Sequence, residues 1–419
     1  MNDTIAQTSP APSPTEASVG SGPERRTVSR RLAFAGFSVI LVVLFASSAA
    51  PSPFFVVYQG EWGFAPWLLT FAFAVYAVTL LLTLLTVGSL SDHVGRRPVL
   101  IGALILEALA MVLFALAPNI ETVVLARALQ GIATGAATGA FSAALTDLAP
   151  PQNRALGATM SGLASVGGLA VGAIFAGVSI QTEARPIAST FLVLAALFVV
   201  ALGFVLAAPE TVTRRPGAVR SLLPHVAVPS RARTEFTIAI PVLLAGWMTG
   251  GLFLGLVPQI LRDVFDLSSG LVSGGTIAVL SLVGVASIYV SRRMAGRPVV
   301  VVGSLALVLG VSAVGASILL GSVALLALGT AVTGVGFGIT FAGEMRLIAP
   351  LAESHQRGEL FAAIYVVSYL SFGVPAIIAG AVVGIFHLVP TAIGYALIVV
   401  VSAAAGVIIQ LARARRAAP

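Results

Sequence analysis

Apolar stretches long enough to cross a bilayer follow one another along almost the whole chain. A helix needs about 20 mostly apolar residues to span the hydrocarbon core, and this requirement is met repeatedly between residues 32 and 411. Of the 419 residues, 58% are hydrophobic and 9% are charged, and the mean hydropathy is +1.03. Because this balance is far from that of a soluble globular protein, the sequence predicts an all-α membrane protein.

The apolar stretches predict twelve transmembrane helices. The expected spans are residues 32–58, 66–88, 98–117, 121–147, 155–178, 186–208, 235–257, 270–290, 298–318, 322–347, 358–385 and 390–411. The first span resembles a secretory signal, since four arginines lie between residues 25 and 31 and small residues occupy 46–49. Because another span follows instead of a soluble domain, we expect an uncleaved first helix.

The arginines predict the orientation of these helices. The chain has no lysine, and 20 of its 23 basic residues lie in the tails or in alternate connections. Arg185 and Arg262 lie on the other side, and Arg127 lies within a span. The positive-inside rule therefore places both termini in the cytoplasm. We expect a multi-pass protein of the plasma membrane. The net charge of +7 reflects this topology, and nothing indicates a nucleic-acid surface.

The longest polar connection divides the spans into six and six. It covers residues 209–234, which we interpret as a cytoplasmic linker between six-helix bundles at 30–208 and 235–412. Residues 1–29, rich in Pro, Ser, Thr and Ala, are predicted to be a disordered cytoplasmic tail. Residues 413–419 are predicted to be a basic cytoplasmic tail.

Weak similarities between the two halves indicate a duplicated six-helix unit. At offsets of 200 to 203 the matches, in order along both halves, are Gln59 with Gln259, Arg97-Pro98-Val99 with Arg297-Pro298-Val299, and Gly131, Gly135 and Arg154 with Gly334, Gly338 and Arg357. Two such bundles that meet at an interface can enclose a cavity at the membrane midplane and open it to either face. This geometry is typical of a transporter.

The connection after the second span carries an unusual concentration of charge. Residues 88–100 read GSLSDHVGRRPVL and resemble the G-x-L-x-D-x-x-G-R-R loop of the major facilitator superfamily. The resemblance implies a conformational latch in which Asp92 pairs with the arginines and accepts from the N-terminal end of the eleventh helix. The expected latch residues are Gly88, Leu90, Asp92, Gly95, Arg96, Arg97 and Asp147. Alternatively, the arginines only anchor the topology.

Arg127 lies within the fourth span, where Arg127-Ala-Leu-Gln130-Gly131 resembles the R-x-x-Q-G pattern of the same superfamily. A charge near a helix centre costs about 2.5–3.5 kcal/mol even on the lenient insertion scale, so Arg127 should face a polar cavity or a partner acid. We expect it to contact substrate or to couple transport to protons. The alternative is an arginine whose head reaches the outer interface.

Glu107 lies at the middle of the third span, where an ionised carboxylate is disfavoured. It is therefore a candidate proton carrier. Two alternatives remain open, because Glu107 can pair with Arg127 on the next helix or stay protonated against a neighbour.

The resemblance extends over nearly all of residues 30–412 and implies the major facilitator fold, with two pseudo-symmetric six-helix bundles. It also implies a substrate cavity lined by the first, fourth, seventh and tenth helices. The candidate cavity residues are mainly aromatic or soft: Gln130, Phe37, Tyr58, Tyr76, Trp247, Met248, Phe337, Phe341, Tyr365 and Tyr369. They favour a small amphipathic or hydrophobic organic compound over sugars or phosphates, although such aromatics also face lipid or fill cores.

The direction of transport depends on the fifth helix. Proton-driven drug antiporters of the superfamily carry G-P-x-x-G-G there, whereas this chain has Gly167-Gly168-Leu-Ala-Val171-Gly172, without the proline and one glycine. We expect proton-coupled efflux of a drug or metabolite by alternating access. Metabolite uptake by proton symport or uniport is the alternative.

Other chemistry has little support in the sequence. Without cysteine there is no disulfide or thiolate metal site, and without lysine there is no phosphate-binding loop. The four histidines are isolated, so no metal or other cofactor is expected. A polytopic membrane enzyme, the remote alternative, would need a clustered catalytic set, and a transporter-like sensor would normally carry a sizeable soluble domain. The sequence indicates neither feature. We therefore expect a functional monomer whose partners are a small molecule, protons and membrane lipids.

Overall fold

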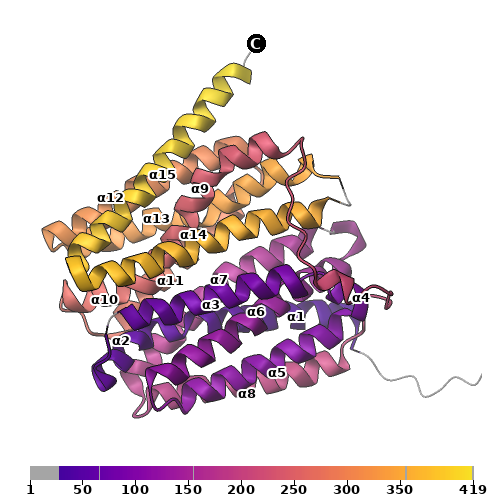
Figure 1. Ribbon diagram of the computed structural model, residues 1–419, viewed down its shortest axis with the longest axis horizontal. Coiled ribbons are helices and arrows are strands. Elements are labelled where there is room, and N and C mark those ends of the chain that lie inside the picture. Colours follow the sequence, from indigo (N-terminus) through magenta and orange to yellow (C-terminus); the bar gives the residue numbers. More distant parts are fainter. Residues whose placement is uncertain (1–27, 66, 154, 354–355, 418–419) are drawn as a thin grey trace, which may run out of the picture.

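The computed structural model describes residues 28–65, 67–153, 155–353 and 356–417. These residues form helices joined by short connections, as Figure 1 shows. The tail predicted at residues 1–29 lies outside the described residues except for its last two positions, and so do residues 418–419. The helices are α1 Arg30–Ala49, α2 Pro51–Trp62, α3 Trp67–Val87, α4 Ser91–Val94, α5 Arg96–Ala115, α6 Ile120–Leu148, η1 Pro151–Asn153, α7 Ala155–Thr182, α8 Pro186–Ala207, η2 Arg220–Leu222, α9 Arg233–Gly251, η3 Leu252–Leu256, α10 Val257–Asp263, α11 Gly270–Ser291, α12 Gly296–Leu320, α13 Val323–Ile348, η4 Ala349–Leu351, α14 Arg357–Phe386 and α15 Leu388–Ala417.

Eleven helices among the described residues are long and apolar enough to cross a membrane. All eleven coincide with predicted spans, which confirms an all-helical multi-pass membrane protein. The predicted fourth span corresponds to α6, which is not among the eleven. Its 29 residues exceed the length required for a crossing, but Arg127 and Gln130 lower its hydropathy.

The first and seventh predicted spans are each interrupted by irregular backbone. The first is divided into α1 and α2 at Ala50, directly before Pro51. The seventh consists of α9, the π-helical turn η3 and α10, with Pro258 at the start of α10. Proline lacks the N–H that would continue the helical hydrogen bonds, so these interruptions follow from the sequence.

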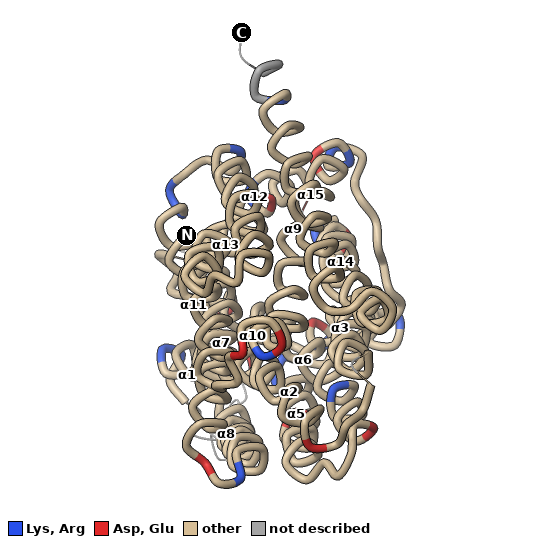
Figure 2. Tube along the Cα trace, turned by 90° about the vertical axis from the view of Figure 1, so that its left-hand side faces the viewer, with Lys and Arg blue, Asp and Glu red and all other residues tan. Residues whose placement is uncertain are grey.

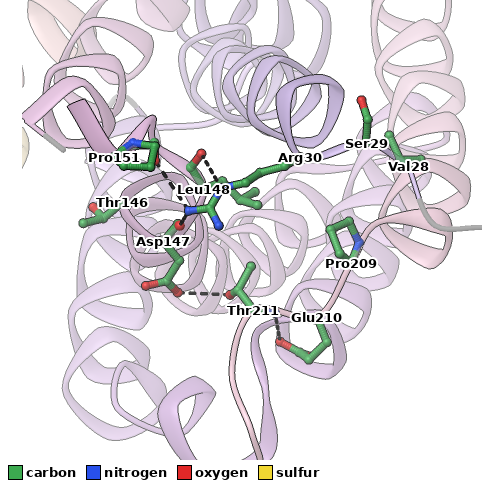
Figure 3. Close-up of a pocket in the computed structure, with 11 residues that line it drawn as sticks. Val28, Ser29, Arg30, Thr146, Asp147, Leu148, Pro151, Pro209, Glu210 and Thr211 are labelled. Atoms are coloured by element: carbon green, nitrogen blue, oxygen red, sulfur yellow. Dashed lines mark hydrogen bonds between the residues drawn. The ribbon is translucent and has the colours of Figure 1, made fainter. Parts of the chain in front are cut away.

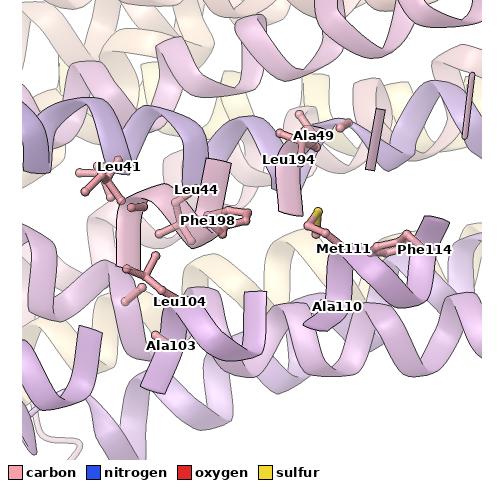
Figure 4. Close-up of a cluster of buried hydrophobic side chains, with 14 of the residues drawn as sticks. Leu41, Leu44, Ala49, Ala103, Leu104, Ala110, Met111, Phe114, Leu194 and Phe198 are labelled. Carbon is pink, nitrogen blue, oxygen red and sulfur yellow. The ribbon is translucent and has the colours of Figure 1, made fainter. Parts of the chain in front are cut away.

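The buried apolar side chains form two main cores. One is built mostly from the helices before residue 209, including Leu41 and Leu44 of α1, Phe114 of α5 and Phe198 of α8. Figure 4 shows these side chains spread along the space between α1, α5 and α8. The other core is formed by residues of α9, η3 and α10 to α15. In Figure 1, α1 to α8 fill the lower part of the view, and α9 and α12 to α15 fill the upper part.

Glycines allow close helix contacts at corresponding places in the two groups. A side chain at Gly135 of α6 would place its Cβ 2.6 Å from the Leu80 carbonyl oxygen of α3. The same distance separates a Cβ at Gly334 of α13 from the Leu280 carbonyl oxygen of α11. Across the two groups, α7 packs against α11 and α3 packs against α14.

The connection between α8 and α9 is held against the segment that links α3 to α5. The Ser89 hydroxyl donates to the Ser221 carbonyl oxygen at 2.8 Å, and the Arg215 N–H donates to the His93 carbonyl oxygen at 2.9 Å. We call this end of the molecule, where α1 also begins, the arginine face. The end at which α2 and α10 terminate is the opposite face.

Candidate functional site

A buried polar site lies between α1, α5 and α6. Arg127 of α6 has only 1% of its surface exposed. Its Nη1 donates to the Ser48 carbonyl oxygen at 3.1 Å and to Gln130 Oε1 at 2.8 Å. Gln130 Nε2 in turn donates to the Ser47 carbonyl oxygen at 2.8 Å. The Arg127 head is therefore engaged inside the helix group and does not reach the interface.

The helix interruption at Pro51 explains why a backbone acceptor is available there. In an uninterrupted helix the carbonyl of Ser47 would accept from the N–H of residue 51. Pro51 has no N–H, so the Ser47 carbonyl needs another donor, which Gln130 supplies. Freed backbone groups at membrane depth are commonly satisfied by neighbouring side chains in this way.

Aromatic rings complete the surroundings of the Arg127 guanidinium. Its Cζ lies 5.0 Å from the ring centroid of Phe55, 5.3 Å from that of Tyr76 and 5.8 Å from that of Phe114. Such cation–π contacts stabilise a cation most when it is desolvated. Arg127 Nε has no hydrogen-bond partner.

Glu107 of α5 lies in the same buried region, with no exposed surface. One carboxyl oxygen accepts from Thr134 Oγ1 at 2.7 Å, and the other has no hydrogen-bond partner. No ion pair joins Glu107 to Arg127, although both side chains are among the described residues. Glu107 can therefore gain or lose a proton without breaking a salt bridge.

A charge network lies at the arginine face. Arg96 is largely buried and pairs with Asp92 four residues earlier. Arg96 Nε also lies 3.4 Å from Asp147 Oδ2, and its Nη1 donates to Ser91 Oγ at 2.7 Å. This geometry brings Asp92, Arg96 and Asp147 together, and the ion pair of Asp92 is with Arg96 of its own segment.

Glu210 joins this network from the end of α8. Its carboxylate accepts from the N–H groups of Arg96 at 2.9 Å and Arg97 at 3.0 Å, and so caps the first turn of α5. The Arg97 side chain reaches back to the carbonyl oxygens of Val205 and Leu206. Gly95 has a φ of +103° and leaves room for the carboxylate, since a Cβ there would lie 2.6 Å from Glu210 Oε2.

A cavity of about 720 Å³ opens beside this network. Figure 3 shows Arg30 of α1 and Asp147, Glu210 and Thr211 among the side chains around it. The Arg30 guanidinium donates to the carbonyl oxygens at the end of α6, including that of Leu148 at 3.3 Å. Thr211 Oγ1 donates to Asp147 Oδ2 at 3.0 Å. The polar groups here thus tie together the ends of α1, α5, α6 and α8.

The ten predicted cavity residues fall into several environments. Trp247, Phe341, Tyr365 and Tyr369 form one cluster, in which the Trp247 ring lies 5.8 Å from Phe341 and 4.9 Å from Tyr369 between centroids. Tyr76 packs near Tyr369, and its hydroxyl donates to Ser48 Oγ at 3.0 Å.

The other predicted cavity residues lie elsewhere. Phe37 packs on Phe141 in the first core, and the Tyr58 hydroxyl donates to the Phe114 carbonyl oxygen at 3.4 Å. Met248 and Phe337 pack in or against the second core. Gln130 belongs to the Arg127 site.

Comparison with known proteins identifies the family. The profile described as Major Facilitator Superfamily matches residues 37–317. The chain belongs to this superfamily. In fold it is similar to the human organic anion transporter MFSD10, with a TM-score of 0.65 and 20% identity over 92% of this chain and 100% of that one. Membership of this superfamily points to a transporter.

Three transporters are similar over shorter segments. The inner membrane transport protein YajR of Escherichia coli (strain K12) is 39% identical over 87 residues, which is 21% of this chain and 19% of YajR. The multidrug transporter mfsB of Aspergillus fumigatus is 50% identical over 48 residues, 12% of this chain and 8% of mfsB. An uncharacterized transporter of Rickettsia bellii is 41% identical over 68 residues, 16% of this chain and 17% of that protein. This chain therefore matches less than a fifth of the length of each of the three.

Several residues of the buried polar site and of the charge network were not predicted from the sequence. Thr134 lies seven residues after Arg127, and that spacing places both on one face of α6, which was a usable signal. Glu210 was recognisable only as part of Pro209-Glu210-Thr211 after the sixth span. The Ser47 and Ser48 carbonyls gave no signal beyond the presence of Pro51.

Proposed function

We propose that this member of the superfamily is a secondary active transporter that exports a small amphipathic or hydrophobic organic compound in exchange for protons. The observation that carries the proposal is the pair of buried, unpaired ionisable groups, Glu107 and Arg127. Buried ionisable side chains within membrane spans are costly and mark ion or proton pathways. Glu107 has an open carboxyl oxygen, and Arg127 lies on the next helix with no acid bonded to it.

Alternating access supplies the mechanism. We take α6 as the twelfth crossing, so that residues 30–208 and 235–412 form two six-helix units that swivel about a shared cavity. The matching contacts at Gly135 and Gly334 support this division, as do two main cores that are each built mostly from one half. Each unit moves as a body because its own core is closely packed, and the chain acts as a monomer.

The proposed setting is the plasma membrane, with both termini in the cytoplasm. The arginine face is then cytoplasmic, since Arg30, Arg96 and Arg97 lie there, and the opposite face is extracytoplasmic. In this orientation Asp92, Arg96 and Asp147, with the glycines and Leu90 of the same loop, act as the cytoplasmic latch.

The aromatic cluster at Trp247 is the proposed substrate surface. It offers large apolar area with few polar groups, which suits an amphipathic compound better than a sugar or a phosphate. Two relatives are consistent with an organic substrate, since mfsB is named a multidrug transporter and MFSD10 an organic anion transporter.

Proton-coupled uptake, or uniport, is the second candidate. The observation in its favour is the fifth membrane helix, α7, which lacks the proline of the antiporter pattern. In α7 the glycines pack closely on α1, and a Cβ at Gly168 would lie 2.6 Å from the Val42 carbonyl oxygen. The helix keeps its tight contact with α1 without the antiporter proline.

Transport by the purified protein in proteoliposomes tests the proposal. A panel of amphipathic dyes is loaded, a pH gradient of either sign is imposed, and dye movement is followed with wild-type protein, Glu107→Gln and Glu121→Gln. Glu121 is an exposed acid at the start of α6 and serves as the matched control. We expect Glu107→Gln to abolish gradient-driven movement while exchange of dye down its own gradient persists, because only the proton carrier is lost.

Two outcomes would contradict the proposal. Gradient-driven movement by Glu107→Gln at the wild-type rate would remove this residue from proton coupling. Dye movement in the same direction as the protons would replace export with uptake.

A further inference from the structure

The hydrogen bonds between helices α1–α8 and helices α9–α15 are concentrated at the opposite face. Within the part of the chain that the structure describes, four such bonds involve helical or capping residues. The Ser52 hydroxyl donates to the Leu254 carbonyl oxygen, and Ser269 Oγ donates to Gln181 Oε1 at 3.2 Å. The other two come from Arg262.

Arg262 bridges α10 to α2. Its Nη2 donates to Gln59 Oε1 at 3.2 Å, and its Nη1 donates to the Val56 carbonyl oxygen at 3.4 Å. Its Nε pairs with Asp263 Oδ1 at 2.6 Å. Figure 2 looks onto this face, where α10 and α2 lie side by side near the centre. A cation from one helix group thus holds two neutral oxygens of the other.

Ser52 attaches the beginning of the same short helix α2. Its acceptor, Leu254, lies in the π-helical turn η3, four residues before Pro258, which has no N–H to donate to that carbonyl. The α2 segment is therefore held against α9–α10 at both ends. Beside it α7 and α11 leave no space for a side chain, since a Cβ at Gly177 would lie 2.5 Å from the Gly270 carbonyl oxygen.

We propose that Arg262 and Ser52 form a clamp on α2 that keeps the extracytoplasmic side of the transporter closed. The inference rests on the proposed function, because a clamp of this kind matters only if the two helix groups separate at that face. The partners of Arg262 in α2 are uncharged, so water replaces them readily when the groups part. The clamp therefore biases the equilibrium towards closure without locking it.

Labelling of a single cysteine tests the clamp. The chain has no cysteine of its own, so Ser273→Cys gives one reporter thiol. Ser273 lies on α11 beside a cavity of about 30 Å³ that Val56, Pro258 and Arg262 also line, and its hydroxyl is buried without a partner. A membrane-impermeant maleimide added from the extracytoplasmic side should label this thiol only when that side opens.

In the reporter background we expect Arg262→Gln to raise the labelling rate about tenfold, since hydrogen bonds to a charged group shift such equilibria by roughly that factor. Arg185→Gln is the matched control, because Arg185 is the other arginine predicted on this side, lies directly before α8 and, among the described residues, donates no side-chain hydrogen bond to α2 or to α9–α15. It should label at the reporter's own rate. Equal rates for Arg262→Gln and Arg185→Gln would overturn the clamp.

Gln59→Ala provides a second variant with a smaller change. It removes the Gln59 acceptor of Arg262 and should raise the labelling rate severalfold; an unchanged rate counts against the clamp even if Arg262→Gln does not reach the membrane. Labelling needs neither substrate nor a pH gradient. If the clamp variants label faster but the wild-type protein moves no dye, proton-coupled export is refuted and the clamp is retained. If the wild-type protein exports dye but the clamp variants label at the reporter's own rate, the clamp alone is refuted.

Discussion

Replacing Glu210 with alanine should destabilise the protein through the first turn of α5. The carboxylate accepts from the N–H groups of Arg96 and Arg97, which have no partners within their own helix. Loss of a capping acceptor costs about 0.5–2 kcal/mol, and loss of an acid at a helix N-terminus costs about 0.3–1 kcal/mol. Because Glu210 is exposed, water replaces part of what is lost, and we expect about 1–2 kcal/mol in total.

Thermal unfolding of the purified protein in detergent measures this cost. A change of that size should lower the Tm by about 1–2 °C in a chain of 419 residues, compared at one scan rate because unfolding of a large membrane protein is commonly irreversible. Glu183→Ala is the control, since this exposed acid lies between α7 and α8 and, among the described residues, its side chain accepts no hydrogen bond from a helix N-terminus. It should stay within about 0.5 kcal/mol of wild type.

Gly95→Ala perturbs the same contact between the first turn of α5 and the Glu210 carboxylate. A Cβ at residue 95 would strain a φ of +103° and would displace the Glu210 carboxylate. In the double variant the capping bond is lost only once, so the two Tm shifts should add to more than the shift of the double variant. The capping account is wrong if Glu210→Ala has the same Tm as Glu183→Ala. It is also wrong if the Tm shifts of Gly95→Ala and Glu210→Ala sum to the shift of the double variant.

Two further variants separate stability from transport. Pro51→Ala restores an N–H that competes with Gln130 for the Ser47 carbonyl, so we expect an unchanged or higher Tm together with slower dye transport in proteoliposomes; transport at the wild-type rate would contradict this. Asp92→Asn breaks a pair whose acid is 57% exposed, so its stability cost should stay below about 1 kcal/mol. As a latch residue it should nonetheless change the labelling rate of the extracytoplasmic reporter thiol, and an unchanged rate would leave the loop as a topology anchor.

The positions of the helices were predictable because hydrocarbon imposes a strict rule. A backbone in lipid must satisfy its own hydrogen bonds over about 20 residues, so apolar length alone fixes most boundaries. The predicted spans 66–88 and 270–290 became α3 and α11 with ends shifted by one residue at most. The rule also predicted the span 121–147, which became α6, although Arg127 and Gln130 lower its hydropathy; both side chains are satisfied by tertiary contacts that hydropathy does not describe.

The sites were predicted less completely because they depend on which neighbour each side chain meets. Arg127 and Glu107 were recognisable, since charge within a span is costly wherever it points. Phe37 and Tyr58 were not separable from Trp247 by composition, because all three are aromatic residues of membrane helices. Rotation of each helix about its axis decides between core and cavity, and that rotation is set by packing with helices distant in sequence.

Two prolines connect the start of α2 to different parts of the transporter. Pro51 leaves the Ser47 carbonyl without a helical donor, and Gln130 of the buried polar site takes it. Pro258 offers no donor to the Leu254 carbonyl, and Ser52 takes that one. Since each unsatisfied carbonyl in lipid costs several kcal/mol, both bonds should form whenever their partners are in reach. A change in the Arg127 site that moves the start of α2 therefore also moves Ser52, so the buried charges and the extracytoplasmic closure share one short helix.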